Sequence, residues 1–234
     1  MALILNIETA TQTCSVALCN EGIPVSVRES IENRDHASVL TVFISEILEE
    51  KHLSVSDIDA VSVSIGPGSY TGLRIGVSVA KGLCYAAGKP LIKIPTLKAL
   101  AAGIVSKGLS VSVNTLIPML DARRMEVYTG IYSRELKELL PVKAEVITET
   151  SFREWIEKGP VLFFGDGAPK CEQVIKNKNA VFINSFPASA SYMGPLSELL
   201  FSESRFEDVA YLEPFYLKDF IATTPRNKVL PINE

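Results

Sequence analysis

Residues 61–87 read VSVSIGPGSYTGLRIGVSVAKGLCYAA, and this stretch decides the fold class. From Val61 to Ile65, β-branched residues alternate with serines, which is typical of a packed strand. The turn Gly66-Pro67-Gly68 ends that strand. Ser69 follows as a good N-cap, because its hydroxyl can accept from a free N–H at a helix start. The stretch therefore predicts a buried strand, a glycine turn and a long helix.

The glycine turn has two interpretations. A turn of this kind points backbone N–H groups and the positive end of the helix dipole at whatever lies above it, which suits a phosphate. Alternatively, the glycines only permit a tight turn and close packing. The lysine of the G-x-x-x-x-G-K-[ST] loop is absent, so the sequence leaves both interpretations open.

The helix expected at residues 70–87 is apolar on nearly all sides. Its only charged residues are Arg74 and Lys81, which lie on one face, seven positions apart. Such a helix must be covered nearly all round. Either a second layer of this chain or another protein supplies the cover.

Composition is that of an ordinary globular protein. The chain has 234 residues, 47% of them hydrophobic and 21% charged, with a net charge of −4. It therefore has no global field that attracts nucleic acid. The N-terminal residues do not form a signal peptide, and no apolar run approaches the roughly 20 residues that span a bilayer. The four cysteines form no C-x-x-C pair, so we expect reduced core thiols and a cytoplasmic protein.

The order of expected elements predicts an α/β protein with two lobes. A hairpin (3–7 and 14–18), a helix (36–50), the 61–87 unit, a strand (91–94) and a helix (97–105, with Thr96 as cap) form the first lobe, residues 1–105. A second strand-turn-strand opening, 115–120 and 126–132, begins the smaller lobe, residues 106–234. Its further elements are helices at 152–157 and 170–177 around a strand at 161–164, then a segment at 197–202. Residues 223–234 are expected to be a loose tail.

Four stretches together resemble the TsaB family, also called YeaZ. They are LILNIETAT (3–11), IGPGSYTGLRIG (65–76), DARRMEVY (121–128) and GDGA (165–168). The resemblance implies an actin-like fold of two lobes, shared with sugar kinases and Hsp70 ATPase domains and ribonuclease H-like in topology. It also implies a role in forming threonylcarbamoyladenosine, the modified adenosine beside the anticodon of tRNA.

The resemblance further implies how the protein acts. TsaB proteins are paralogues of the catalytic transferase TsaD and bind it as a scaffold or activator, helped by the ATPase TsaE. When alone they form homodimers, and they contact tRNA mainly through the complex. TsaD holds a metal with an H-x-x-x-H pair, whereas the matching residues 94–102 contain no histidine and the chain has only His36 and His52. We therefore expect a non-catalytic subunit without a metal; for His36 an ordinary surface position is favoured over a partner contact.

A nucleotide site is expected to be weak. In an actin-like fold, an acidic residue and a glycine of the first hairpin lie beneath the phosphates; here Glu8 takes the acidic place and Ala10 stands where glycine would help. We expect no cofactor on the chain alone beyond weak ATP or ADP binding. Candidate phosphate contacts are Glu8, Thr9, Thr11, Gly66, Gly68, Ser69, Gly165, Asp166 and Gly167. The alternatives are a small ATPase or kinase and, less favoured, a metal-dependent glycopeptidase.

The apolar helix is the strongest functional signal. We expect helices 36–50 and 69–87 to pack side by side and present one surface to a related subunit. The contact candidates are Tyr70, Leu73, Arg74, Val77 and Lys81, followed by Val39 and Phe43. Alternatively, these residues complete the core of their own lobe. Arg123 and Arg124 could contact RNA or phosphate, or form a solvated turn.

Overall fold

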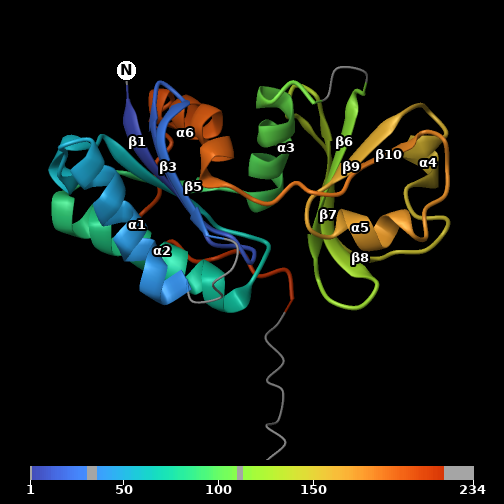
Figure 1. The fold of residues 1–234 in the computed structure, drawn as a ribbon, viewed down its shortest axis with the longest axis horizontal. Helices are drawn as coiled ribbons and strands as arrows, with labels where there is room; N and C mark the ends of the chain where they lie inside the picture. Colours follow the sequence, from blue (N-terminus) through green and yellow to red (C-terminus); the bar gives the residue numbers. More distant parts are fainter. Residues whose placement is uncertain (1, 31–35, 110–112, 219–234) are drawn as a thin grey trace, which may run out of the picture.

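The computed structural model describes residues 2–30, 36–109 and 113–218, which form two five-stranded sheets side by side (Figure 1). The first sheet has the order β3-β2-β1-β4-β5. Its strands are β1 (Leu3–Glu8), β2 (Cys14–Asn20), β3 (Ile23–Ser30), β4 (Ala60–Ser64) and β5 (Leu91–Ile94). The first three strands are antiparallel, and β4 and β5 continue parallel to β1.

The second sheet repeats this topology. It has the order β10-β9-β6-β7-β8, again with an antiparallel meander followed by two parallel strands. Its strands are β6 (Thr115–Asp121), β7 (Glu126–Ser133), β8 (Glu138–Val146), β9 (Val161–Phe164) and β10 (Ala180–Ile183). Two copies of one ribonuclease H-like sheet confirm the expected α/β, actin-like architecture with two lobes.

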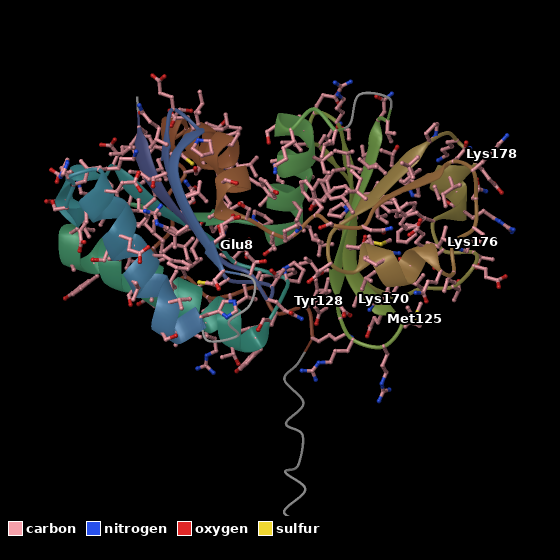
Figure 2. The ribbon with its side chains drawn as sticks, viewed as in Figure 1. Glu8, Met125, Tyr128, Lys170, Lys176 and Lys178 are labelled. Carbon is pink, nitrogen blue, oxygen red and sulfur yellow. The ribbon has the colours of Figure 1, made fainter. Side chains whose placement is uncertain are left out.

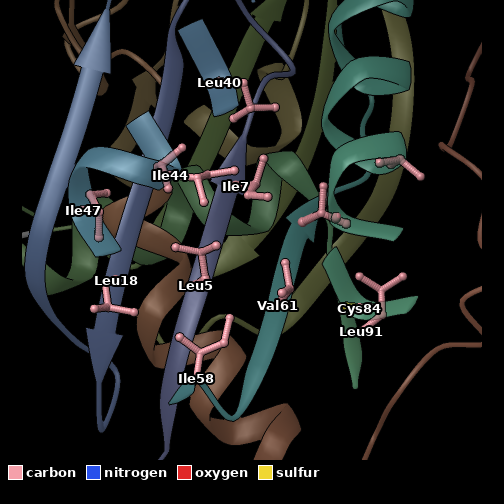
Figure 3. Close-up of a cluster of buried hydrophobic side chains, with 14 of the residues drawn as sticks. Leu5, Ile7, Leu18, Leu40, Ile44, Ile47, Ile58, Val61, Cys84 and Leu91 are labelled. Carbon is pink, nitrogen blue, oxygen red and sulfur yellow. The ribbon is translucent and has the colours of Figure 1, made fainter. Parts of the chain in front are cut away.

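Helices cover both faces of the first sheet, which explains why its central strands are buried throughout. The helices α1 (His36–Glu50) and α2 (Tyr70–Ala87) lie on one face, and α6 (Gly194–Ser202) lies on the other (Figure 1). Leu5 and Ile7 pack under α1 and α2 in one cluster (Figure 3). Ile4 packs with Leu196 of α6 in another. Alternate side chains of β1 therefore pack into two different hydrophobic clusters, one on each face of the sheet.

The helix α3 (Thr96–Ser106) lies between the lobes and contacts both. Leu97 and Leu100 pack against the second sheet, whereas Ala99 and Ala102 pack with residues of the first. Small alanines on one side allow the close approach that two lobes around one helix require. Shorter helices complete the fold. They are α4 (Arg153–Ile156), α5 (Ala168–Glu172) and the 3₁₀ turns η1 (Val55–Asp57) and η2 (Ala190–Met193).

The C-terminal part of the chain returns to the first lobe. Helix α6 contacts β1 and β5, and Glu207 pairs with Leu91 at the edge of the first sheet. We call residues 207–218 the C-terminal strap. The strands of the first sheet come before the lobe boundary predicted at 105/106, and those of the second sheet come after it. Helix α6 and the strap also come after this boundary in the sequence, but they pack on the first lobe.

Several local expectations were wrong. Thr96 is the first residue of α3 rather than its cap, which is Pro95. The helix expected at 170–177 is the shorter α5, and β8 and β10 were not anticipated. The tail predicted at 223–234 lies outside the described residues. The four cysteines are free and buried, as predicted. No helix in the described part of the chain is long and apolar enough to cross a membrane.

Candidate functional site

The glycine turn before α2 packs directly on the turn between β1 and β2. Ser69 N–H donates to the carbonyl of Ala10 over 2.6 Å. A Cβ on Gly68 would lie 2.3 Å from that same oxygen, and one on Gly72 would lie 2.1 Å from the Thr9 carbonyl oxygen. Both glycines are therefore required for this close approach. The Ser69 hydroxyl accepts from Gly72 N–H at 3.2 Å, which confirms the predicted cap.

Several polar groups around this turn have partners within the chain. Gly66 N–H donates to the Thr96 hydroxyl at 3.0 Å, and Thr9 donates its hydroxyl hydrogen to the Gly72 carbonyl at 2.8 Å. Thr11 accepts from the N–H of Thr13. This arrangement favours the packing interpretation of the glycines over the phosphate interpretation.

Glu8 is the most perturbed group in this region. It ends β1 with a fully buried side chain. Its Oε1 accepts from Ala10 N–H at 2.6 Å, and its Oε2 has no hydrogen-bond partner among the described residues. Burial raises the pKa of Glu8 from 4.5 to about 7, against smaller lowering effects led by the Ala10 N–H. Close to neutral pH, this carboxyl is therefore only partly ionised.

The second glycine turn has the same packing role. A Cβ on Gly165 would lie 2.3 Å from the Met119 carbonyl oxygen, and Gly167 N–H donates to that oxygen. Asp166 Oδ1 accepts from Asp121 N–H at 2.9 Å, and desolvation raises the pKa of Asp166 although its side chain reaches solvent. The Asp166 charge also contributes to the raised pKa of Glu8. The carboxyl groups of Glu8, in the first lobe, and Asp166, in the second, therefore lie within electrostatic range of each other.

The described residues contain no cluster of three or more histidine, cysteine or acidic side chains that could hold a metal ion. His36 is buried rather than an ordinary surface residue, and its Nε2 lies 3.0 Å from the Thr11 carbonyl oxygen. His52 lies in an exposed turn. The two histidines therefore belong to different local environments.

Burial corrects two of the interface candidates. Leu73 and Val77 are 0% and 4% exposed and belong to the lobe's own core, so they cannot contact a partner in this conformation. Lys81 donates to the carbonyls of Ala210 and Leu212 in the C-terminal strap, at 3.0 and 3.1 Å. The apolar positions of α2 are mostly covered by its own sheet.

Tyr70 and Arg74 remain at the surface. Arg74 donates to the Tyr70 hydroxyl at 3.1 Å, and the Tyr70 ring lies 4.9 Å from that of Tyr216 in the strap. Val39 and Phe43 of α1 are partly buried and pack against the core. These four side chains are therefore at least partly exposed, and those of Val39 and Phe43 also contact the core.

Sequence reasoning missed a groove between α1 and α2, of about 460 Å³. We call this the α1/α2 groove. It is lined by Ala37, Tyr70, Thr71, Arg74, Ile75, Ser78 and Val79. The spacing of these α2 residues, one face of a helix, is a signal that could have identified it. The strap was missed because nothing local marks its contacts with α2.

Comparison with known proteins fits this architecture. Residues 27–224 match the family model described as TsaD, tRNA N6-adenosine threonylcarbamoyltransferase. The tRNA threonylcarbamoyladenosine biosynthesis protein TsaB of Escherichia coli K12 is 31% identical over 94% of this chain and 96% of its own. The TsaB protein of Bacillus subtilis 168 is 30% identical over 92% of this chain and 93% of its own. The solved structure of YeaZ from Pseudomonas aeruginosa has a TM-score of 0.80 at 25% identity, over 93% of this chain and 100% of that one.

The two repeated sheets and their connecting helix define the class: a protein of the actin-like fold with two lobes. Within that class, the chain belongs to the TsaB (YeaZ) family, to which the TsaD family model also extends.

Proposed function

We propose that this chain takes part in tRNA threonylcarbamoyladenosine biosynthesis as a scaffold or activator that binds a TsaD-type catalytic subunit. Its curated relatives carry the name of that biosynthesis. The α1/α2 groove is the observation that carries the proposal. It combines partly exposed apolar side chains, Ile75 and Val79, with an aromatic and a cationic one, Tyr70 and Arg74. Aromatic residues and arginine are enriched in protein interfaces.

The groove suits a helical partner. Two adjacent helices leave a furrow that a third helix can fill with ridges-into-grooves packing. Further exposed apolar side chains lie on the same two helices, Val42 at 49% and Tyr85 at 86% exposed. A related subunit with the same fold would supply such a helix pair, because it carries the same two elements. A second copy of this chain carries the same helix pair, so we propose a homodimer when the chain is alone.

The chain itself is proposed to be non-catalytic. The described residues do not assemble the metal ligands that a metal-dependent glycopeptidase needs. Two amides at the first glycine turn, those of Ser69 and Gly66, donate to Ala10 and Thr96, which weighs against a kinase or ATPase. We assign no cofactor to the chain alone beyond weak ATP or ADP binding. The further proposals are a TsaE-type ATPase as partner, tRNA contact mainly through the complex, and a cytoplasmic location.

The test is partner binding by variants that change only the groove. Ser78 is exposed in α2, so Ser78→Arg places bulk and charge in the groove without entering the core. The matched control is Leu199→Arg, at a residue 52% exposed on α6 across the sheet. Size-exclusion chromatography with light scattering should show that the parent and Leu199→Arg form a one-to-one complex with the TsaD-type subunit, and that Ser78→Arg binds at least tenfold more weakly.

Two results would contradict the proposal. One is a parent chain that stays apart from the TsaD-type subunit at micromolar concentration. The other is an unchanged affinity for Ser78→Arg, which would place the interface elsewhere. Circular dichroism of each variant establishes that the fold is retained.

A further inference from the structure

The turn between β6 and β7 carries two arginines in an unusual backbone conformation. Arg123 has φ 71° and Arg124 has φ 50°, both in the left-handed region. This region is unfavourable for a residue with a side chain, and turns that need it usually contain glycine or asparagine. Both arginines are exposed, so the packing of their side chains does not explain their presence.

The turn is held by a network that fixes its shape. Lys170 donates to Asp121 Oδ1, the Arg124 carbonyl and the Glu126 carbonyl, at 2.5, 2.8 and 2.7 Å. Arg123 N–H donates to Asp121 Oδ1 at 2.7 Å. Because these hydrogen bonds fix the backbone of the turn, a ligand that binds the two arginine side chains would not have to spend binding free energy on ordering the loop.

The acidic side chains beside the turn form ion pairs with lysines and not with the two arginines. Asp121 forms an ion pair with Lys170, and Glu126 forms one with Lys218 of the C-terminal strap. Neither Arg123 nor Arg124 forms an ion pair with any residue the structure describes. Asp166 lies behind the turn, where its carboxylate accepts from Asp121 N–H. Two neighbouring guanidinium groups therefore face solvent with their charge available.

The position of the turn connects it to the proposed docking face. Met125, the residue after Arg124, lies with Lys170 at the lower end of the second lobe, and Tyr128 lies nearer the first lobe (Figure 2). The strap links this end to α2, because Lys218 lies over the Tyr128 ring while the tilted Tyr216 ring contacts that of Tyr70.

We propose that Arg123 and Arg124 contact the phosphate backbone of RNA. This inference rests on the proposed function, because the RNA is the tRNA that the partner subunit modifies. Guanidinium groups match phosphate oxygens in bidentate geometry. Two such contacts give affinity without sequence preference. A local contact of this kind agrees with a chain whose net charge of −4 does not attract RNA by itself.

The test uses the full chain in complex with the TsaD-type subunit, and an unmodified tRNA transcript as probe. The variant is Arg123→Asn with Arg124→Gly, since both new residues favour the left-handed region and should keep or raise the melting temperature. The matched control is Arg134→Ala with Lys137→Ala. It removes the same charge from the exposed turn between β7 and β8, at the other end of β7.

Fluorescence anisotropy at several salt concentrations gives the affinity and its salt dependence. We expect the Arg123/Arg124 variant to bind about tenfold more weakly at low salt, with a log–log salt slope reduced by roughly 1 to 2. The control should match the parent. Equal loss in the control, or unchanged affinity and slope in the variant, would overturn the inference. Complex formation is measured separately: if the parent fails to bind the TsaD-type subunit, the proposed function fails, whereas a normal complex with unchanged tRNA binding refutes only the role of the arginines.

Discussion

Glu8 gives the sharpest quantitative prediction, because its carboxyl is fully buried while its Oε2 has no hydrogen-bond partner in the described part of the chain. The perturbation is Glu8→Gln. Glutamine keeps an acceptor oxygen for the Ala10 N–H, which donates to Glu8 Oε1 at 2.6 Å. It replaces the ionisable carboxyl with a neutral amide of nearly the same size, so the pH-dependent part of the stability difference reports the free energy of burying the charge.

The sign follows from the two pKa values. The carboxyl titrates at 4.5 in the unfolded chain and at about 7 in the folded one, so the folded state binds the proton more tightly. Below pH 4.5 both states are protonated and the group adds no pH dependence. As the pH rises from 4.5 to about 7, the unfolded state ionises first and the free energy of unfolding falls. A shift of about 2.5 pKa units amounts to about 3 kcal/mol.

The assay is urea denaturation of parent and variant at pH 4, 5.5, 7 and 8.5, followed by circular dichroism. The other titrating groups are the same in parent and variant, so their contributions largely cancel in the difference between the two free energies of unfolding. We expect Glu8→Gln to gain up to about 3 kcal/mol relative to the parent between pH 4 and pH 8.5. Glu8→Ala should show the same pH dependence, but at a lower stability throughout, because it leaves the Ala10 N–H without its acceptor.

The result that refutes this reasoning is a stability difference that stays constant across the pH range. It would mean that the Glu8 carboxyl titrates at its ordinary pKa and is reached by water. Carbon-13 NMR of the glutamate carboxyl groups gives an independent reading. One resonance should titrate near pH 7 in the parent and be missing from Glu8→Gln.

Two further predictions concern α2. Gly72→Ala should destabilise the fold by about 1–3 kcal/mol, since its Cβ would lie 2.1 Å from the Thr9 carbonyl oxygen, whereas Gly82→Ala, with no atom within 4 Å, should stabilise it by about 0.5–1 kcal/mol. Thermal denaturation checks both, and equal effects would contradict the close contact with Thr9. Leu73→Ala should lose about 2–5 kcal/mol, because Leu73 is 0% exposed, but Arg74→Ala should change stability by no more than about 0.5 kcal/mol. A mild Leu73→Ala in urea denaturation would mean that Leu73 is a surface contact after all.

The arrangement of residues in the site was less predictable than the fold, and the reason is visible in α2. Its hydrophobic pattern correctly predicted a helix that must be covered, yet it did not distinguish Leu73 and Val77, which face the sheet, from Tyr70 and Arg74, which face outward. That distinction depends on how the helix is rotated against β4, which the distant turn at Ala10 and the strap carbonyl of Ala210, bound by Lys81, help to fix. Such contacts between distant segments leave no periodic signal in the sequence.

By itself, the sequence determined the elements and their order: alternation marked β4, the glycine turn and Ser69 marked the start of α2, and the second strand-turn-strand opening marked the repeated lobe. These features follow from local sterics and periodicity, which act within a few residues. Only the tertiary structure decided that the glycines serve close packing, that Glu8 is buried with a raised pKa, and that the strap returns across α2. Each of these depends on which distant groups share a dry interior, because burial and unpaired hydrogen-bonding groups are properties of the packed chain and not of any one stretch.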